Sequence, residues 1–275
     1  MKVEYKDKTY KSYPDLLDKL YKGKPITLLT DGESNAKMVK GITEHLNVKL
    51  MHLLPHDKAD VLMERPIKRT VCAFAIAGEC WKPCLNTAGR GGIIKNGETT
   101  NAIELARLRR TNFYWDNRKE FLAQLYKEIY MFTKKCEKTK QKPSIRLNGT
   151  SDIQWEYIEI DGYENIFAMF PDVQFYDYTK IPTRKIDHIP NYHLTWSYSE
   201  ANDKYAKMFD KVPNNKAVVF KNKILPSMFK GLKVIDGDTH DMRFLDEPNS
   251  VVGLKAKGKA RQDKSGFVIN VIQLA

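Results

Sequence analysis

Three cysteines on one segment are the side chains with the clearest chemical potential. Cys72, Cys80 and Cys84 are separated by seven and then three residues, in a stretch rich in glycine. Thiolates are soft ligands that suit iron–sulfur clusters or zinc. Three of them can hold three irons of a [4Fe-4S] cluster and leave the fourth iron open to a substrate or cofactor. The alternative is that all three are ordinary small buried residues, which fits Cys72 best because it lies in an apolar run.

A structural zinc site is the second metal interpretation of the same cysteines. Zinc in such sites takes four protein ligands, so one more side chain would be needed. Cys136, His52 or His56 could supply it, although each lies at some distance from the three cysteines in sequence. The sequence therefore leaves an iron–sulfur cluster, zinc and no metal as open alternatives.

A polar turn follows the predicted strand at residues 144–147. Backbone N–H groups and small hydroxyls of such a turn can bind a charged ligand. The alternative is a plain Asn-Gly turn without a ligand. The candidate cofactor-binding residues of this turn are Asn148, Gly149, Thr150, Ser151 and Asp152.

Further polar positions follow two later runs of β-forming residues. Lys180 comes after the run at residues 175–179, and its ammonium group could bind a carboxylate or phosphate, which makes it the candidate catalytic residue. Ser197 and Glu200 end an aromatic run whose inward residues could line a pocket. A lone lysine is otherwise a solvated surface residue, and an aromatic strand is otherwise part of the core.

An acidic segment near the carboxyl terminus suggests a different chemistry. Asp236, Asp238, His240 and Asp241 could bind a hard cation such as Mg²⁺, as in a magnesium-dependent nuclease. The restriction-nuclease core also needs an acidic residue two positions before a lysine on the next strand, and residues 251–257 lack it. An aspartate-rich turn at a strand end is the simpler interpretation.

The balance of charge favours a polyanionic partner such as a nucleic acid or nucleotide. The chain has 46 Lys and Arg against 34 Asp and Glu, which gives a formal net charge of +12. A field of that sign attracts polyanions. The candidate contacts are Lys255, Lys257, Lys259 and Arg261, which lie beside two glycines. The alternative is that these residues are solvated side chains of an edge strand.

Length and composition indicate a globular chain. Hydrophobic residues make up 42% and charged residues 29% of the 275 residues, which is not a disordered composition. No run of about 18 apolar residues could span a membrane, and the polar N-terminus lacks the apolar core of a secretory signal. Four cysteines do not make a disulfide scaffold. We therefore expect a cytoplasmic protein with reduced thiols and no membrane partner.

The elements that position these residues are typical of an α/β fold. We expect an extension at residues 1–24 and one domain at residues 25–275. Alternating strands and helices favour a mostly parallel sheet shaped as a partial (β/α) barrel, with chemistry at the carboxyl ends of the strands. Predicted helices cover residues 38–46, 101–110 and 117–136, and residues 199–209 are predicted as a helical or turn segment. Predicted strands cover residues 26–29, 69–77, 144–147, 173–178, 192–197, 217–220, 233–235 and 251–254.

Several long motifs resemble those of a bacteriophage family called gene product 88. The resemblance covers about residues 25–270 and implies a phage or prophage origin, and hence the cytoplasm of a bacterial host. It implies no particular activity. The motifs are CLNTAGRGG (84–92), RLNGTSDIQWE (146–156), FYDYTK (175–180), NYHLTWSYSE (191–200), VIDGD (234–238) and GLKAKGKA (253–260).

The order of elements is also similar, more distantly, to that of radical S-adenosylmethionine enzymes. In those proteins a three-cysteine loop follows the first strand of a partial barrel, although with C-x3-C-x2-C spacing. The resemblance implies a [4Fe-4S] cluster, S-adenosylmethionine as cofactor and a reductant protein as partner. It also implies that Ser197 and Glu200, at a later strand end, are cofactor-binding residues. The basic charge of the chain adds a nucleic acid or nucleotide as the expected substrate. The alternative function is a basic nucleic-acid-binding protein whose cysteines hold zinc or nothing, and a magnesium-dependent nuclease is a third.

Overall fold

The computed structural model describes residues 1–275 except 35, 44 and 272–275. Within this part, one ten-stranded sheet has the strand order β3-β4-β5-β6-β7-β8-β11-β10-β9, and β12 pairs with β8 beside that path. Its strands are β3 (Leu29–Asp31), β4 (Leu46–Met51), β5 (Lys142–Arg146), β6 (Gln174–Thr179), β7 (Tyr192–Ser197), β8 (Lys216–Phe220), β9 (Met228–Phe229), β10 (Leu232–Asp236), β11 (Val251–Lys255) and β12 (Val268–Ile269).

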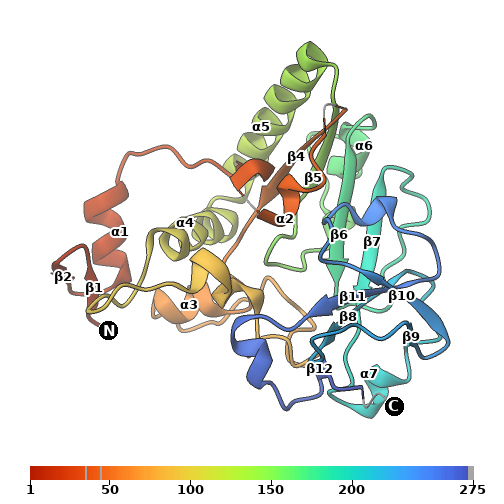
Figure 1. The fold of residues 1–275 in the computed structure, drawn as a ribbon. Helices are drawn as coiled ribbons and strands as arrows, with labels where there is room; N and C mark the ends of the chain where they lie inside the picture. Colours follow the sequence, from red (N-terminus) through yellow and green to blue (C-terminus); the bar gives the residue numbers. More distant parts are fainter. Residues whose placement is uncertain (35, 44, 272–275) are drawn as a thin grey trace.

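Parallel pairing runs through the middle of the sheet. Every neighbouring pair from β4 to β10 along the strand order is parallel. Only the outer strands β3 and β9 pair antiparallel, with β4 and β10. Because β3 and β9 end the strand order, the sheet stays open and does not close into a barrel (Figure 1). The prediction of an α/β fold with a mostly parallel, partial-barrel sheet is confirmed.

Strands β7 and β8 separate toward their carboxyl ends. β7 pairs with β8 only through Trp196 and Ser197. Beyond this point β12 pairs with β8 through Val268 and Ile269, again in parallel. A segment close to the carboxyl terminus of the chain therefore completes the carboxyl edge of the sheet.

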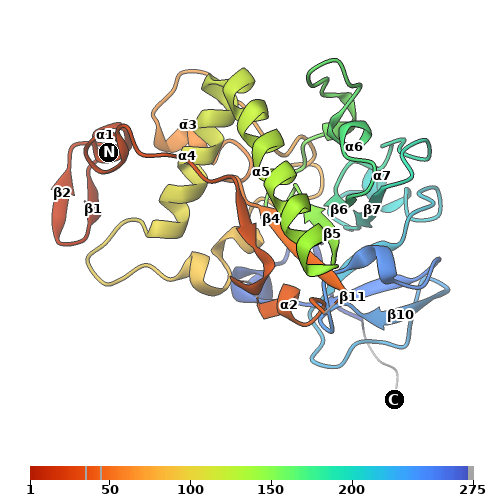
Figure 2. The same cartoon turned by 90° about the horizontal axis from the view of Figure 1, so that it is seen from above.

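Two long helices follow each other in the chain, and the second lies across β4 and β5 of the sheet, whereas the first lies to one side (Figure 2). Helix α4 (Ala102–Asp116) begins where the Asn101 side chain accepts the N–H of Glu104, a standard N-cap. Helix α5 (Arg118–Thr139) follows almost directly and ends at Lys140, whose backbone is left-handed. Its apolar side chains recur at helical spacing and pack into the main core: Phe121, Leu125, Ile129, Phe132 and Cys136.

Short elements cover the opposite face of the sheet. They are helix α2 (Ala36–Val39) and the 3₁₀ turn η5 (Arg243–Leu245), which supply Met38 and the neighbouring Met242 to a small apolar cluster. The strands supply Val48, Leu50 and Tyr176 to the same cluster. A face that mixes these residues with charged side chains is typical of the inner side of a barrel-like sheet, where ligands can be bound.

Residues 1–24 form a small unit beside α4. It consists of β1 (Val3–Tyr5), β2 (Lys8–Tyr10) and α1 (Tyr13–Tyr21), and β1 pairs antiparallel with β2. Ser12 caps α1 by accepting the N–H of Asp15. The apolar side chains of this unit pack with residues of helix α3 (Lys58–Leu62) and α4, in a cluster separate from the main core.

Two local predictions, for residues 38–46 and 69–77, are wrong. The helix predicted over 38–46 ends at Val39, and a turn at Thr43 leads into β4, whose alternating side chains face both sides of the sheet. Residues 199–209, predicted as a helical or turn segment, hold the short helix α7 (Asp203–Ala206) followed by turns, as expected. The segment 69–77, predicted as a strand, makes a single bridge at Cys72 and then turns, with the Gly78 N–H bonded to the carbonyl of Phe74. Apolar content alone did not distinguish a strand from a buried turn.

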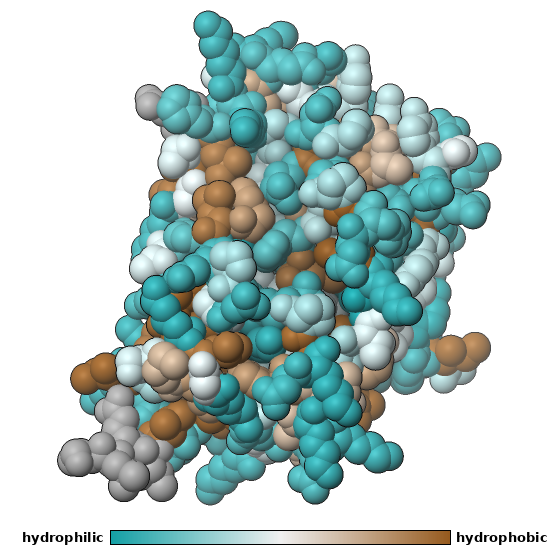
Figure 3. Space-filling view, turned by 90° about the vertical axis from the view of Figure 1, so that its right-hand side faces the viewer, coloured by the Kyte–Doolittle hydropathy of each residue, from teal (hydrophilic) through white to brown (hydrophobic). Residues whose placement is uncertain are grey.

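The remaining short helical elements are α6 (Ile166–Met169) and 3₁₀ turns at η1 (Gly32–Ser34), η2 (Leu85–Thr87), η3 (Gly89–Gly92), η4 (Trp155–Tyr157) and η6 (Gly258–Gln262). Figure 3 shows one face of the molecule, where apolar residues are interrupted by hydrophilic ones. Among the described helices, none combines the length and the apolar character needed to cross a membrane.

Candidate cysteine-loop site

Residues 72–92, here called the cysteine loop, lie against the carboxyl edge of the sheet. The loop begins with a parallel bridge between Cys72 and Asp152, and the Asp152 N–H donates at 2.7 Å to the carbonyl just before Cys72. Farther along, the hydroxyl of Ser199 donates to the carbonyl of Gly78 at 2.9 Å. The chain beyond β5 and the chain beyond β7 therefore both hold the loop in place.

All three thiols of the loop are free. Burial raises the pKa of Cys72 well above its ordinary value, raises that of Cys80 to about 11, and raises that of Cys84. The charges of Cys80 and Cys84 add to the effect on Cys72. The thiols therefore stay protonated at neutral pH unless a cation binds, because metal binding displaces the protons.

Backbone N–H groups point at two of the sulfurs. The N–H of His56 donates to Cys72 Sγ at 3.4 Å, and the N–H of Asn86 donates to Cys84 Sγ at 3.5 Å. Such bonds favour the thiolate form of sulfur, and around iron–sulfur clusters they tune the reduction potential.

Cationic side chains also approach the loop. Burial raises the pKa of Cys80, and the ammonium of Lys180 opposes that effect. Burial also raises the pKa of Cys84, and the positive charges of Arg107 and Lys58 oppose that effect. Three thiolates bound to a cluster carry net negative charge, and these cations would offset part of it.

The candidate fourth ligands for zinc do not join the cysteines. Cys136 is buried within α5 in the main core. The ring of His56 faces Asp57, with Nδ1 at 2.7 Å from a carboxylate oxygen, and the ring of His52 packs against Gly149. Within the described part of the chain, no three or more His, Cys, Asp or Glu side chains form a group that could hold a metal ion. The same finding covers Cys72, Cys80 and Cys84, so binding of a [4Fe-4S] cluster would require the loop to close around it.

The polar turn after β5 is fixed by contacts inside the protein. Asn148 donates its backbone N–H and its side-chain amide to the two carboxylate oxygens of Asp177, at 2.7 and 3.2 Å. Ser151 donates its hydroxyl to the side-chain oxygen of Asn148 at 2.8 Å. Burial raises the pKa of Asp177 to about 7, against the opposing charge of Arg146. These polar groups fix the conformation of the turn. Most of their donors and acceptors already bind other groups of the protein.

The middle of this turn approaches both a strand and the cysteine loop. A Cβ atom at Gly149 would lie 2.5 Å from the carbonyl oxygen of Met51, so only glycine permits this approach. Thr150 donates its hydroxyl to the carbonyl of Leu53 at 2.5 Å, and its own carbonyl lies 3.9 Å from Cys72 Sγ. The turn therefore reaches the first cysteine through its backbone.

A buried ion cluster joins the turn to the chain after β6. Asp152 accepts the N–H of Lys180 at 2.7 Å and lies 3.3 Å from a nitrogen of Arg184. Arg184 Nε donates in turn to Glu156 at 2.8 Å. The side chains of Arg184 and Glu156 are 1% and 0% exposed, so this pair is completely removed from water. Asp152 thus positions Lys180 and does not face a free space.

The ammonium of Lys180 lies beneath the cysteine loop. It donates to the carbonyl oxygens of Ser197 and Tyr198 at 2.8 and 3.1 Å. A Cβ atom at Gly78 of the loop would lie 2.9 Å from the Lys180 side chain. Burial lowers the pKa of Lys180 to about 8, and the neighbouring Cys80 opposes that change. The structure therefore brings Lys180 and Ser197 to the loop.

The side chain of Glu200 makes its contacts away from the cysteine loop. Its carboxylate accepts from the hydroxyl of Tyr198 at 3.0 Å and lies 3.2 Å from Lys230 Nζ. Tyr198 belongs to an apolar cluster with Phe209 and packs beside Phe229. The backbone N–H of Glu200 binds Gly266 O instead, next to β12.

A comparison with protein families adds one decisive match. The family model described as Gene product 88 matches residues 27–271, which is most of the chain. The chain belongs to the gene product 88 family. The family resemblance expected from the motifs is thereby confirmed, and the match includes the cysteine loop, the polar turn and β12. No curated protein and no solved structure matches the gene product 88 chain.

The acidic segment of this gene product 88 protein is neutralised by cations of its own chain. Asp241 is buried and lies 2.7 Å from a nitrogen of Arg146 and 3.1 Å from Lys37 Nζ. His240 Nδ1 lies 3.2 Å from a nitrogen of Arg243. Because the expected magnesium ligands face arginine and lysine, they do not form a carboxylate cluster.

The first half of the gene product 88 basic segment pairs with the same acidic turn. Lys257 Nζ lies 2.8 Å from Asp238, and Lys255 Nζ lies 3.9 Å from Asp236. Both lysines are exposed, so these pairs are weak and could exchange for phosphate contacts.

The second half of the segment lies at the rim of the cysteine loop. A Cβ atom at Gly258, in η6, would lie 3.7 Å from Ala88 of the loop. Lys259 and Arg261 in the same 3₁₀ turn are exposed. The gene product 88 fold therefore places two cationic side chains beside the segment that follows Cys84.

Three contributors to the site were missed from the sequence. Arg107 and Lys58 approach Cys84, and Trp81 of the loop stacks on His56 with ring centroids 6.2 Å apart. Three arginines among residues 107–110 could have drawn attention to the first of these. Nothing in the local sequence distinguishes Lys58 from the other lysines of the gene product 88 chain.

Proposed function

We propose that this gene product 88 protein is an iron–sulfur enzyme of the radical S-adenosylmethionine type. In this proposal Cys72, Cys80 and Cys84 hold a [4Fe-4S] cluster, and the open iron binds S-adenosylmethionine. The observation that supports it most directly is three free thiols on one loop that is bound to the carboxyl edge of a parallel sheet. That edge is where α/β folds bind their ligands.

The chemistry of the donor set fits such a group. Three free thiols are available, two of them already accept backbone N–H groups, and cationic side chains oppose the negative charge. A structural zinc ion would need a fourth ligand, which the loop does not supply within the described residues.

When bound, the cluster and S-adenosylmethionine supply a 5′-deoxyadenosyl radical by one-electron reduction of the sulfonium. The residues of this chain would bind and orient both groups and exclude water. Lys180 would place a positive charge under the loop, and Gly149 would allow close backbone approach near Cys72. The electron has to come from elsewhere, so the proposal implies a reductant protein, in a cytoplasm that keeps thiols reduced.

Titration calorimetry with S-adenosylmethionine tests this proposal. The anaerobic, iron-loaded protein should bind the cofactor, and the metal-free protein should bind it at least about tenfold more weakly. The reason is that the amino and carboxylate groups of the cofactor lose their iron partner, and tenfold corresponds to about 1.4 kcal/mol. The Cys136→Ala variant, which leaves the loop intact, should behave as the unaltered protein does. Absence of binding to the iron-loaded protein would rule out this cofactor.

Exposed cations at the rim of the loop favour a nucleic acid or nucleotide as substrate. Lys259 and Arg261 are the best placed, because Lys255 and Lys257 already face carboxylates. The same rim supports the alternative function, a nucleic-acid-binding protein that needs no cluster. The two functions differ in whether binding depends on the cysteines.

The salt dependence of nucleic-acid binding should show whether Lys259 and Arg261 contact phosphates. Binding of a single-stranded oligonucleotide should weaken as salt rises, because each neutralised phosphate releases counterions. The double variant Lys259→Glu, Arg261→Glu should reduce the slope of log K against log salt by about 0.7 for each phosphate that is no longer neutralised. Anisotropy titrations from low to physiological salt measure that slope.

Lys138→Glu and Lys185→Glu provide the control, since both lysines are exposed and lie outside the rim. They should leave the slope nearly unchanged. If both double variants reduced the slope equally, the salt dependence would reflect the net charge of the protein and not contacts at the rim. Binding that persists after Cys72, Cys80 and Cys84 are all replaced by alanine would favour the binding protein over the enzyme.

A further inference from the structure

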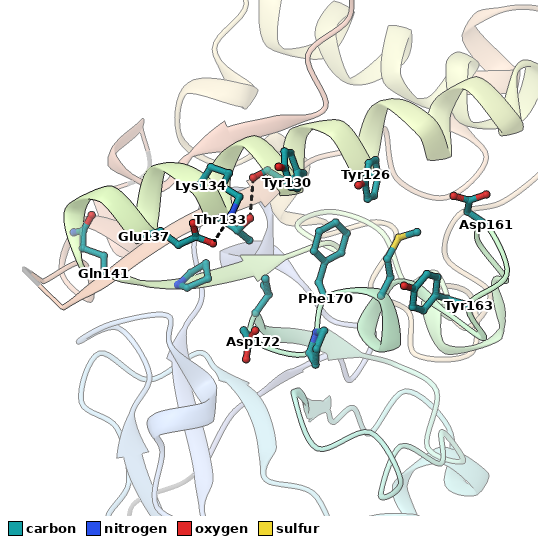
Figure 4. A pocket seen from close by; sticks show the side chains of 14 residues that line it. Tyr126, Tyr130, Thr133, Lys134, Glu137, Gln141, Asp161, Tyr163, Phe170 and Asp172 are labelled. Carbon is teal, nitrogen blue, oxygen red and sulfur yellow. Dashed lines mark hydrogen bonds and ion pairs between the residues drawn. The ribbon is translucent and has the colours of Figure 1, made fainter.

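A groove of about 620 Å³ lies between α5 and the chain that leads into β6 (Figure 4). Its lining includes Pro143 at the start of β5 and Val173 just before β6. These residues stand at the amino edge of the parallel strands, so the groove lies at the opposite edge from the cysteine loop. It is therefore separate from the site proposed above.

Aromatic side chains form the walls of this groove. Tyr126 and Tyr130 lie one turn apart on α5 and stack on each other, with ring centroids 6.1 Å apart. Phe170 faces Tyr126 from the opposite wall at 5.6 Å. The two tyrosines are 41% and 44% exposed, which is high for large aromatic side chains that also pack on neighbouring rings.

The groove carries negative charge on a strongly basic protein. Asp161 and Asp172 both line it and are exposed, and neither forms an ion pair within the described part of the chain. Glu137 also lines it, at 2.8 Å from Lys134. Three carboxylates thus face one ammonium group in the lining, whereas the whole chain carries a formal charge of +12. This charge repels phosphates and attracts cations.

We infer that this groove binds an extended, proline-rich peptide segment that carries an arginine or lysine. Proline rings pack on aromatic surfaces, and a polyproline II segment is already ordered before it binds. From Tyr126 to Glu137 the helix extends about 16 Å, at 1.5 Å per residue. That length accommodates about five residues of polyproline II at 3.1 Å each. The cationic side chain of the peptide would then contact Asp161 or Asp172.

Fluorescence anisotropy with the full-length protein and a labelled peptide of five prolines flanked by arginines tests this inference. Binding should be saturable, and Tyr130→Ala should weaken it at least about tenfold by removing an aromatic wall. Asp172→Asn should weaken it about threefold, and more at low salt, because one carboxylate is removed. Both side chains are at the surface, so neither change should unfold the protein.

Matched variants outside the groove serve as controls. Tyr157→Ala removes a tyrosine that is 64% exposed, and Asp187→Asn removes an exposed carboxylate. Both should bind the peptide as the unaltered protein does, and a peptide with glutamate in place of arginine should bind at least about tenfold more weakly. Absent binding, or equal weakening in the control variants, would overturn the inference. Two other results would also overturn it. If the protein were a dimer in sedimentation and Tyr130→Ala abolished the dimer, the groove would bind a second copy of the chain. If the protein bound oligothymidine and Tyr130→Ala abolished that binding, the groove would bind a nucleic acid.

Discussion

Replacing Cys80 with alanine is expected to lower the iron content of the anaerobically reconstituted protein from about four atoms per chain to nearly none. Only three thiols of the loop are available as ligands, and two cannot hold a four-iron cluster firmly. In the structure the Cys80 thiol makes one weak contact, to the carbonyl of Ala75 at 3.8 Å, so the fold should tolerate its removal. Iron and acid-labile sulfide analysis, with visible absorption, measures the effect.

The matched control removes the fourth cysteine of the chain. Cys136→Ala deletes a thiol buried in α5 and should leave iron and sulfide unchanged, although the small cavity lowers stability. Circular dichroism of both variants separates loss of the cluster from loss of the fold. If the unaltered protein contained one zinc atom and no iron, the loop would hold a structural zinc ion instead of a cluster. Equal iron in the protein with and without Cys80 would exclude a ligand role for this residue.

Replacing Arg184 with methionine is expected to lower the free energy of unfolding by about 3–5 kcal/mol. Methionine fills most of the space, but Asp152 and Glu156 lose their cationic partner and remain buried. For a chain of this size such a change corresponds to a fall in melting temperature of roughly 10 °C. Thermal and denaturant unfolding followed by circular dichroism measure it.

Two further variants make this prediction specific. Lys185→Met changes the next residue, which is exposed, and should alter stability by no more than about 0.5 kcal/mol. Adding Glu156→Gln to Arg184→Met should recover part of the stability, because the stranded charge is removed. If Arg184→Met were no less stable than Lys185→Met, the buried ion pair of Arg184 and Glu156 would contribute nothing to the free energy of unfolding.

The sheet and the longest helix were predictable because their signals are local. Apolar positions at helical spacing predicted α5 within a few residues, and β-rich runs predicted β5, β6, β7, β8, β10 and β11. The segment before Cys80 was assigned wrongly because its apolar residues pack in turns. In that segment a hydrogen bond from Asp152, a residue far away in the sequence, replaces a regular ladder.

The composition of the candidate site was only partly predictable, for a different reason. Cysteines and a polar turn stand out by type, so Asn148 and Cys84 could be proposed from sequence. Their partners Asp177 and Arg107 are ordinary residues of a strand and a helix, and only the fold shows that they lie nearby. Glu200 illustrates the reverse case: its position after a strand was suggestive, but its carboxylate bonds to Tyr198.

The pairing of β12 with β8 has a consequence for the order of events during synthesis. The cysteines leave the ribosome early, whereas the strand that completes the adjoining sheet edge lies at Val268–Ile269, close to the end of the chain. At about 5–20 residues per second, roughly ten to forty seconds separate Cys84 from that strand. During this interval the nascent loop lacks its final neighbours, including the 3₁₀ turn η6 that packs beside Ala88. In the proposed function, metal would therefore reach the thiols most easily during this interval, before β12 has paired with β8.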